Sequence, residues 1–186
     1  MLDPSVREYG SWGRYPRVRH RAVVPISWRN EIPDLAALPG SLLPYGYGRS
    51  YGDSCLNEGG TLLDVSGLNR FIHFDEETGV LRCEAGVRLD QILAAFVPRG
   101  WFLPVTPGTK FVSVGGAIAN DIHGKNHHVA GTFGRHVLRF ELVRSSGERL
   151  LCSPEENADL FRATIGGLGL TGLITWAEIR LKPITN

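Results

Sequence analysis

Three histidines and a lysine crowd into one short segment that glycines flank on both sides. His123, Lys125, His127 and His128 all lie within the stretch VGGAIANDIHGKNHHVAGTFG. An imidazole can give or take a proton near neutral pH, and an ammonium group is a localised positive charge. Gly124 separates the first two side chains and lets the backbone approach a flat ligand closely. We therefore predict that His123 and Lys125 contact an electron-rich ring or an anionic substrate.

A metal site is the first alternative for these histidines. His123 and His127 are four residues apart, Asp121 is nearby, and zinc takes such ligands. However, a glycine interrupts the helical face that would align them, and Lys125 would repel a dication. We therefore predict no metal. For His127 and His128 a second alternative stays open, in which they are polar residues held by hydrogen bonds at the edge of a strand or loop.

A second glycine-rich stretch, PYGYGRSYGDS, follows the apolar segment SLLP. Gly46, Gly48 and Gly52 permit positive φ angles, so that consecutive N–H groups can point into one concavity suited to phosphate oxygens. Arg49 adds a planar cation and Ser50 a hydroxyl group. A purely structural turn remains an open alternative for this stretch on its own.

A third stretch starts with PGT, which is typical of a type II turn, and continues as SVGGAIAN. The pattern predicts a strand end that turns into a short helix. Gly115 and Gly116 stand at its N-terminal end, where free N–H groups and the helix dipole attract an anion. Two separate turns that suit phosphate favour a diphosphate ligand.

The stretch GGLGLTG carries Gly167, Gly169 and Gly172 in the spacing GxGxxG of Rossmann dinucleotide sites. That motif requires a strand before it and a helix after it. Here the sequence predicts a helix before it and a strand after it. We therefore reject a Rossmann site.

The segments around these stretches predict the fold class. RFIHFD and VLRCEAG alternate in polarity around a turn, and so do HVLRFELVRS and RLLCS, so residues 70–86 and 136–153 are predicted hairpins. Residues 171–183 are a predicted long strand. The apolar spacing in 87–100 predicts a helix, and Ser153 is the predicted cap of another. We expect an α+β domain with a mostly antiparallel sheet.

Composition narrows the classes of function. The chain has 186 residues, 42% of them hydrophobic, and 20 basic against 19 acidic residues. A net charge of +1 gives no global field for nucleic acid, and the only local excess of charge is RYPRVRHR. Cys55, Cys83 and Cys152 have no CxxC spacing, which favours buried thiols in a reducing compartment. Without a signal peptide or an apolar run long enough to span a bilayer, we expect a cytoplasmic, soluble protein.

The stretches GYGRSYGDS, PGTKFVSVGGAIANDIHGKNHHVAGTFG and GGLGLTGLI, with SWGR near the N-terminus, resemble the flavin domain of the vanillyl-alcohol oxidase superfamily. The resemblance covers nearly the whole chain, and ANDIHGKNHH is its most specific part. It is strongest to oxidases of polyprenyl-phosphate sugars. It implies a two-lobed PCMH-type FAD-binding fold of mixed, mostly antiparallel sheets flanked by helices. The expected bounds are 1–21 for an N-terminal arm and 22–186 for the FAD-binding domain, with lobes 22–105 and 106–186.

The resemblance also implies which residues hold FAD. By motif match, the pyrophosphate loop comprises Tyr45, Gly46, Tyr47, Gly48, Arg49, Ser50, Tyr51, Gly52, Asp53 and Ser54, and the grip continues at Gly108, Ser113, Val114, Gly115 and Gly116. Asn120, Asp121, Ile122 and His123 are expected beside the isoalloxazine ring, and Ile174 near the adenine half. Arg49 stands where many relatives carry a histidine that bonds to the flavin, so we expect noncovalent FAD. His123 and Lys125 are the expected catalytic residues on the substrate side.

The implied activity is the oxidation of a sugar alcohol, in which a hydride moves from the carbon that bears the hydroxyl group to flavin N5. The expected substrate is a sugar or a polyprenyl-phosphosugar. The sequence ends at ITN, so we expect the substrate-binding domain of this family to be absent from the chain. A second chain that supplies it, or a partner keto-reductase, is then an expected partner. Two alternatives stay open: an aldonolactone oxidase that passes electrons to oxygen, and a noncatalytic FAD-binding half-enzyme.

Overall fold

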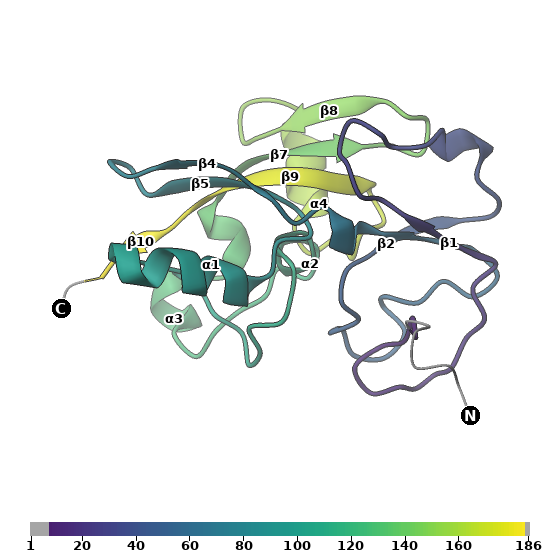
Figure 1. The fold of residues 1–186 in the computed structure, drawn as a ribbon, viewed down its shortest axis with the longest axis horizontal. Coiled ribbons are helices and arrows are strands. Elements are labelled where there is room, and N and C mark those ends of the chain that lie inside the picture. The colour runs from purple at the N-terminus through teal and green to yellow at the C-terminus, as the bar shows by residue number, and fades with distance from the viewer. Residues whose placement is uncertain (1–7, 185–186) are drawn as a thin grey trace.

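The computed structural model describes residues 8–184, and the ends of the predicted arm and domain, 1–7 and 185–186, lie outside the described residues. A five-stranded sheet, a three-stranded sheet and a two-stranded pair form the β structure (Figure 1). The predicted lobe ranges 22–105 and 106–186 stay a prediction. The five-stranded sheet itself takes strands from both ranges.

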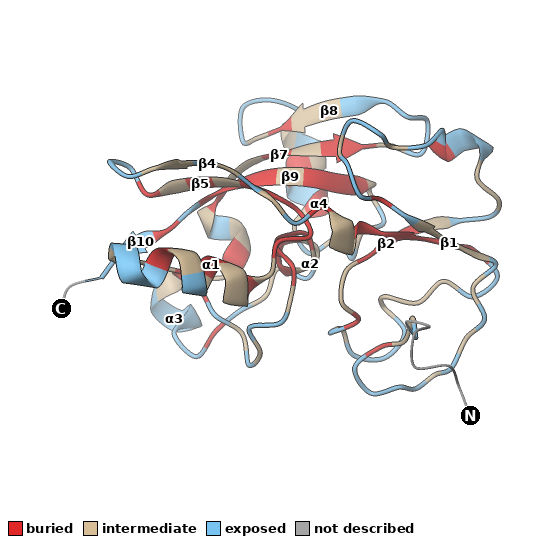
Figure 2. Cartoon of the chain, in the orientation of Figure 1, coloured by how far each residue is buried: buried red, intermediate tan, exposed pale blue. Residues whose placement is uncertain are grey.

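The five-stranded sheet has the order β4-β5-β9-β7-β8, and every neighbouring pair is antiparallel. Its strands are β4 (Phe71–Asp75), β5 (Val80–Glu84), β7 (Val137–Val143), β8 (Arg149–Cys152) and β9 (Leu173–Arg180). Both predicted hairpins and the predicted long strand are therefore confirmed. The strand β9 is central and mostly buried (Figure 2), which is why its apolar positions outnumber its polar ones.

The three-stranded sheet is parallel, with the order β1-β3-β2. Its strands are β1 (Ala22–Pro25), β2 (Leu42–Tyr45) and β3 (Thr61–Asp64), and all four residues of β3 are buried. A short strand with no exposed face is typical of a parallel sheet. At its end, β2 delivers the chain directly into the loop GYGRSYGDS. The small pair joins β6 (Trp101–Phe102) to β10 (Lys182–Pro183).

The α-helices are α1 (Leu89–Phe96), α2 (Val114–Ala119), α3 (His127–Ala130) and α4 (Ala158–Thr164). Short 3₁₀ turns occur at Leu35–Ala37, Val65–Gly67, Val97–Arg99 and Phe133–His136. The predicted helix start at Ser153 is wrong. The Ser153 hydroxyl oxygen accepts from the N–H groups of Glu155 and Glu156, so it closes a separate turn. Asn157, with φ of 50°, then redirects the chain before α4 begins.

The main core lies between the five-stranded sheet and the helices. Helix α1 contributes Leu89, Ile92 and Phe96, the one-sided stripe that the sequence predicts. Burying side chains of this size stabilises the fold by roughly 1.5–3 kcal/mol each. Helix α2 contributes smaller residues and so approaches the sheet closely. Within residues 8–184, no helix has the length and apolar character needed to cross a bilayer.

Candidate functional site

The two predicted phosphate-binding turns meet in the structure. The loop GYGRSYGDS, which follows β2, is called the first loop from here on. A Cβ atom placed on its Gly46 would lie 2.7 Å from the Ser113 hydroxyl oxygen, so the first loop and the start of α2 touch. A cavity of about 600 Å³ lies along this junction. Its volume falls within the range of about 300–1,000 Å³ that is usual for ligand sites. The turns therefore form two walls of one cavity.

Most of the predicted cofactor residues line this cavity. They are Gly46, Tyr47, Gly48, Arg49, Ser50, Tyr51, Ser54, Gly108, Ser113, Gly115, Gly116, Asn120, Ile122, His123 and Ile174. The lining also includes residues that sequence reasoning missed: Trp12, Pro44, Cys55, Val65, Ala85, Pro107, Thr109, Val112, Ala119, Leu168, Gly169 and Gly172. Of these, the two glycines belong to a stretch whose spacing is visible in the sequence. Seven more lie in stretches that the sequence already marks: Trp12, Pro44, Pro107, Thr109, Val112, Ala119 and Leu168. Cys55, Val65 and Ala85 carry no local signal.

The structure places the remaining predicted residues outside the cavity lining. Tyr45 is buried, and its hydroxyl group donates to the Gly10 carbonyl oxygen at 2.6 Å. Val114 is fully buried in the main core. Asp121 accepts from the Gly134 N–H at 2.8 Å, which fixes the turn after α2. The lining also leaves out Gly52 and Asp53 in the first loop and Lys125 before α3, all three of them exposed.

The backbone of the first loop curves around the cavity. Gly48 and Gly52 have φ angles of 63° and 58°, as predicted, but Gly46 does not adopt a positive φ. Position 46 requires glycine for a different reason, namely its close contact with Ser113. At Gly48 a Cβ atom would also collide with the Tyr45 hydroxyl group. The loop therefore requires glycine both for its conformation and for its packing.

The first loop contains backbone N–H groups that have no acceptor among the described residues. No hydrogen bond within residues 8–184 uses the backbone N–H of Gly48, Arg49 or Tyr51. The Arg49 guanidinium lies over the Trp12 ring, 5.3 Å from its centroid, and both side chains line the cavity. Within the described residues the lining contains no aspartate or glutamate. This wall therefore carries positive charge and unpaired donors in a nest-like turn.

The second of the two predicted phosphate-binding turns, at the start of α2, does not have the free N–H groups that the sequence predicts. The expected free N–H groups at the start of α2 are engaged: Gly115 donates to the Ala85 carbonyl oxygen at 2.8 Å, and Gly116 donates to the Ser113 hydroxyl oxygen at 3.1 Å. The reason is close packing, because a Cβ atom on Gly115 would lie 3.0 Å from the Ala85 Cβ. The small residues thus let the helix dock on the end of β5. This wall fixes the shape of the cavity, and its amides are not available to an anion.

The histidine segment closes another part of the cavity. His123 pairs with Thr132 in an isolated antiparallel bridge, and its exposed ring lies 5.4 Å from the His127 ring. Nδ1 of His127 lies 3.0 Å from the Gly124 carbonyl oxygen. His127 and His128 belong to the short helix α3, whereas the alternative placed them at the edge of a strand or loop. Among residues 8–184, no three metal-ligating side chains gather closely enough to hold an ion.

The GGLGLTG stretch connects α4 to β9, which is the order that excludes a Rossmann site. It nevertheless joins the cavity, because Leu168, Gly169 and Gly172 all line it. Gly172 cannot be replaced freely, since a Cβ atom there would lie 2.6 Å from the Val143 carbonyl oxygen. A third glycine-rich turn thus contributes to the cavity wall.

This arrangement corresponds to a known family. Residues 34–153 match the FAD binding domain, and the chain belongs to that family of flavoprotein domains. Among individual proteins, it is 51% identical over 139 residues to decaprenylphosphoryl-beta-D-ribose oxidase of Mycolicibacterium smegmatis, covering 74% of this chain and 30% of that protein.

More distant relatives have other activities in their names. The chain is 34% identical over 123 residues to a putative D-arabinono-1,4-lactone oxidase of Neurospora crassa, covering 66% of this chain and 22% of that protein. It is also 34% identical over 116 residues to human delta(24)-sterol reductase, covering 62% of this chain and 22% of that protein. The chain therefore spans less than a third of the length of each of these curated relatives.

The residues of the cavity fit FAD, the cofactor of this family. FAD carries two linked phosphates, and the first loop offers the amides of Gly48, Arg49 and Tyr51 together with the Arg49 guanidinium. The absence of carboxylates from the described lining removes repulsion against those phosphates. The predicted fold class is confirmed, and so is FAD as the cofactor of the family.

Proposed function

We propose that this chain forms the FAD-binding part of an oxidoreductase that oxidises a hydroxyl-bearing carbon of a sugar, and that it holds FAD without a covalent bond. The observation that carries the proposal is the meeting of the first loop and α2 at Gly46 and Ser113, along a cavity whose lining has no acidic residue among residues 8–184. The 51% identity to a sugar oxidase supports the reaction class.

In this proposal, the first loop holds the diphosphate through the amides of Gly48, Arg49 and Tyr51. Hydrogen bonds to charged groups contribute about 1.5–3 kcal/mol each. Ile122 and His123 lie on the stretch after α2 and face the same cavity, so we assign them to the ring. Bound FAD supplies the acceptor for the hydride that leaves the substrate carbon.

The substrate-side residues have roles that follow from their chemistry. The exposed His123 ring lines the cavity, so it can orient the substrate hydroxyl group and take its proton. Lys125 is exposed two residues later and can attract a substrate phosphate without reaching into the cavity. These roles match a phosphosugar, which carries both a hydroxyl group and an anionic phosphate.

Noncovalent binding follows from the residue at position 49. A guanidinium is a poor nucleophile because its charge is delocalised, and Arg49 also lies over the Trp12 ring. Arg49 can therefore attract the cofactor but cannot bond to the flavin as a histidine does. We also propose that further polypeptide, in the same protein or in a second chain, covers the substrate side.

The test is an absorption spectrum of the purified chain before and after denaturation. We expect a flavin spectrum, and complete release of FAD when the protein is precipitated with acid. Lys125→Ala should slow the reduction of the flavin by a phosphosugar more than it weakens FAD binding. Lys182→Ala, on β10 and outside the cavity lining, is the matched control and should change neither. A colourless protein that ignores added FAD would end the proposal.

The relative named as a lactone oxidase supports a second candidate substrate, an aldonolactone. The same cavity serves both, because the walls described here bind the cofactor. Hydrogen peroxide formed during oxidation of sugar lactones would favour this second reaction. Flavin reduction by a phosphosugar without peroxide would favour the first.

A further inference from the structure

The described part of the N-terminal arm, residues 8–21, is strongly basic although the chain as a whole is nearly neutral. Four arginines against one glutamate give it a charge of +3, whereas the whole chain carries +1. Arg14, Arg17, Arg19 and Arg21 are all exposed. None of them forms an ion pair within residues 8–184. These charges are therefore available to an external anion.

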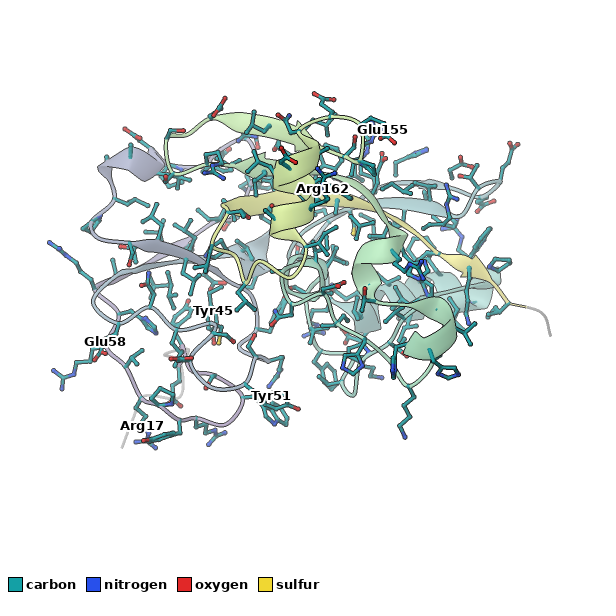
Figure 3. The ribbon with its side chains drawn as sticks, turned by 180° about the vertical axis from the view of Figure 1, so that it is seen from behind. Arg17, Tyr45, Tyr51, Glu58, Glu155 and Arg162 are labelled. Carbon is teal, nitrogen blue, oxygen red and sulfur yellow. The ribbon has the colours of Figure 1, made fainter. Side chains whose placement is uncertain are left out.

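Aromatic side chains lie among these charges. Trp12 is 54% exposed and Tyr15 is 80% exposed, and Tyr51 of the neighbouring first loop is also 80% exposed. Arg17 and Tyr51 both project from the same edge of the molecule, while Glu155 lies at the opposite edge (Figure 3). Exposed tryptophan and tyrosine beside arginine are typical of protein surfaces that lie in the headgroup region of a membrane.

Hydrogen bonds hold the arm against the rest of the domain. The Tyr9 hydroxyl group donates to Oδ2 of Asp64 at 2.8 Å, and the backbone N–H of Trp12 donates to the Ser50 carbonyl oxygen at 3.0 Å. The ring nitrogens of His20 lie 3.0 Å and 3.1 Å from the carbonyl oxygens of Asn57 and Tyr9. Little conformational entropy remains to be lost when such a surface binds.

A second cavity of about 370 Å³ lies within the arm. Among residues 8–184, Arg14, Arg17 and His20 line it, together with one acidic group, the carboxylate of Glu8. In this described lining, two guanidinium groups against one carboxylate leave net positive charge around a space that admits a phosphate group. Arginine binds phosphate oxygens through paired hydrogen bonds.

We propose that this arm surface, which consists of Trp12, Arg14, Tyr15, Arg17, Arg19 and Arg21, docks on an anionic phospholipid bilayer. The arginines contact lipid phosphates and the aromatic rings enter the headgroup layer. Trp12 also lines the FAD cavity, so docking would hold that cavity beside the lipid surface. Nucleic acid is the competing polyanion, but the exposed rings and the fixed arm favour a flat lipid surface.

The test is sedimentation of the full chain with vesicles. We expect binding to vesicles of phosphatidylcholine that contain about one third phosphatidylglycerol, weak binding to pure phosphatidylcholine, and loss of binding in high salt. Arg14→Gln with Arg17→Gln should weaken binding on the order of thirtyfold, from roughly a factor of five for each arginine. Tyr15→Ser should weaken it as well.

The matched control is Arg180→Gln with Lys182→Gln. It removes the same charge at the end of the molecule that lies opposite the arm (Figure 1), and should leave binding unchanged. Equal losses in the arm and control variants, or no preference for anionic vesicles, would overturn the proposal. So would arm-dependent binding to a polyuridine RNA without binding to vesicles. The FAD spectrum, measured separately, shows that each variant is folded and tests the proposed function independently.

Discussion

Replacing Gly46 with alanine puts a methyl group against the opposite wall of the FAD cavity. Its Cβ atom would lie 2.7 Å from the Ser113 hydroxyl oxygen but 3.6 Å from the Ser113 Cβ, which is an ordinary contact. Gly46 has no positive φ, so the backbone itself tolerates alanine. The effect of the substitution therefore arises from one oxygen atom.

Moving the Ser113 hydroxyl oxygen away from the new methyl group destabilises the chain. That oxygen accepts from the Gly116 N–H at 3.1 Å and caps helix α2. Rotating it away loses the cap, which costs about 1 kcal/mol. Keeping it in place forces the two walls apart and weakens FAD binding instead. We expect Gly46→Ala to lower the melting temperature of the chain by roughly 2–4 °C, or its FAD affinity by about fivefold.

The double variant separates this explanation from general damage. Ser113→Ala alone also loses the cap, but it removes the oxygen with which the new methyl group would collide. Adding Gly46→Ala to Ser113→Ala should therefore change the stability and the FAD affinity almost not at all. FAD titration and thermal unfolding of all four proteins give the coupling energy. Gly13→Ala, where a Cβ atom meets nothing within 4 Å, is the control. Strictly additive effects would refute the proposed contact.

Two further predictions concern a thiol and a carboxylate. Cys55 lines the cavity, and burial raises its pKa, so we expect slow alkylation that bound FAD slows further. Burial opposes the charge of Glu178, but hydrogen bonds from Arg139 and Arg82, at 2.6 and 2.7 Å, outweigh it and lower its pKa. Glu178→Gln should therefore lower the free energy of unfolding at neutral pH by about 1–3 kcal/mol.

The sign of the pH dependence follows from that lowered pKa. The stabilisation by Glu178 is present above its ordinary pKa of 4.5 and is lost as the pH falls through the lower folded value. Urea unfolding across this range should show a steeper loss of stability in the natural chain than in Glu178→Gln. Glu148→Gln, at an exposed turn, is the control. For the thiol, Cys55→Ser should abolish the alkylation that FAD slows, and alkylation that ignores FAD would contradict its position in the cavity.

The sequence predicts those structural elements that form between residues close together in the chain. Alternating polarity predicts the hairpins of β4 with β5 and of β7 with β8, because a turn and its two strands lie together in the chain. The glycine positions predict the first loop for the same reason. The parallel sheet could not be predicted, since β1 and β2 have four residues each and pair with β3 across intervening chain.

Contacts between distant residues explain the other differences. The amides of α2 seemed free in the sequence because their acceptors are far away in it: Gly115 donates to Ala85, and Val114 donates to Val87. Cys55 carries no motif, and Trp12 lies in the motif SWGR, which does not indicate what it contacts. Both become cavity residues only when the first loop folds back and the arm packs on it.

The first loop and the start of α2 thus have different roles, although the sequence predicts phosphate binding for both. The amides of α2 are consumed by packing on the end of β5, so in the proposed function the first loop and Arg49 recognise the diphosphate. Substitutions in the first loop should therefore act mainly on FAD affinity and on its dependence on salt. Substitutions at Gly115 should act first on stability, because Ala85 already occupies the space that a side chain would need. Where two motifs resemble each other in a sequence, the partners of their amides decide which one binds the ligand.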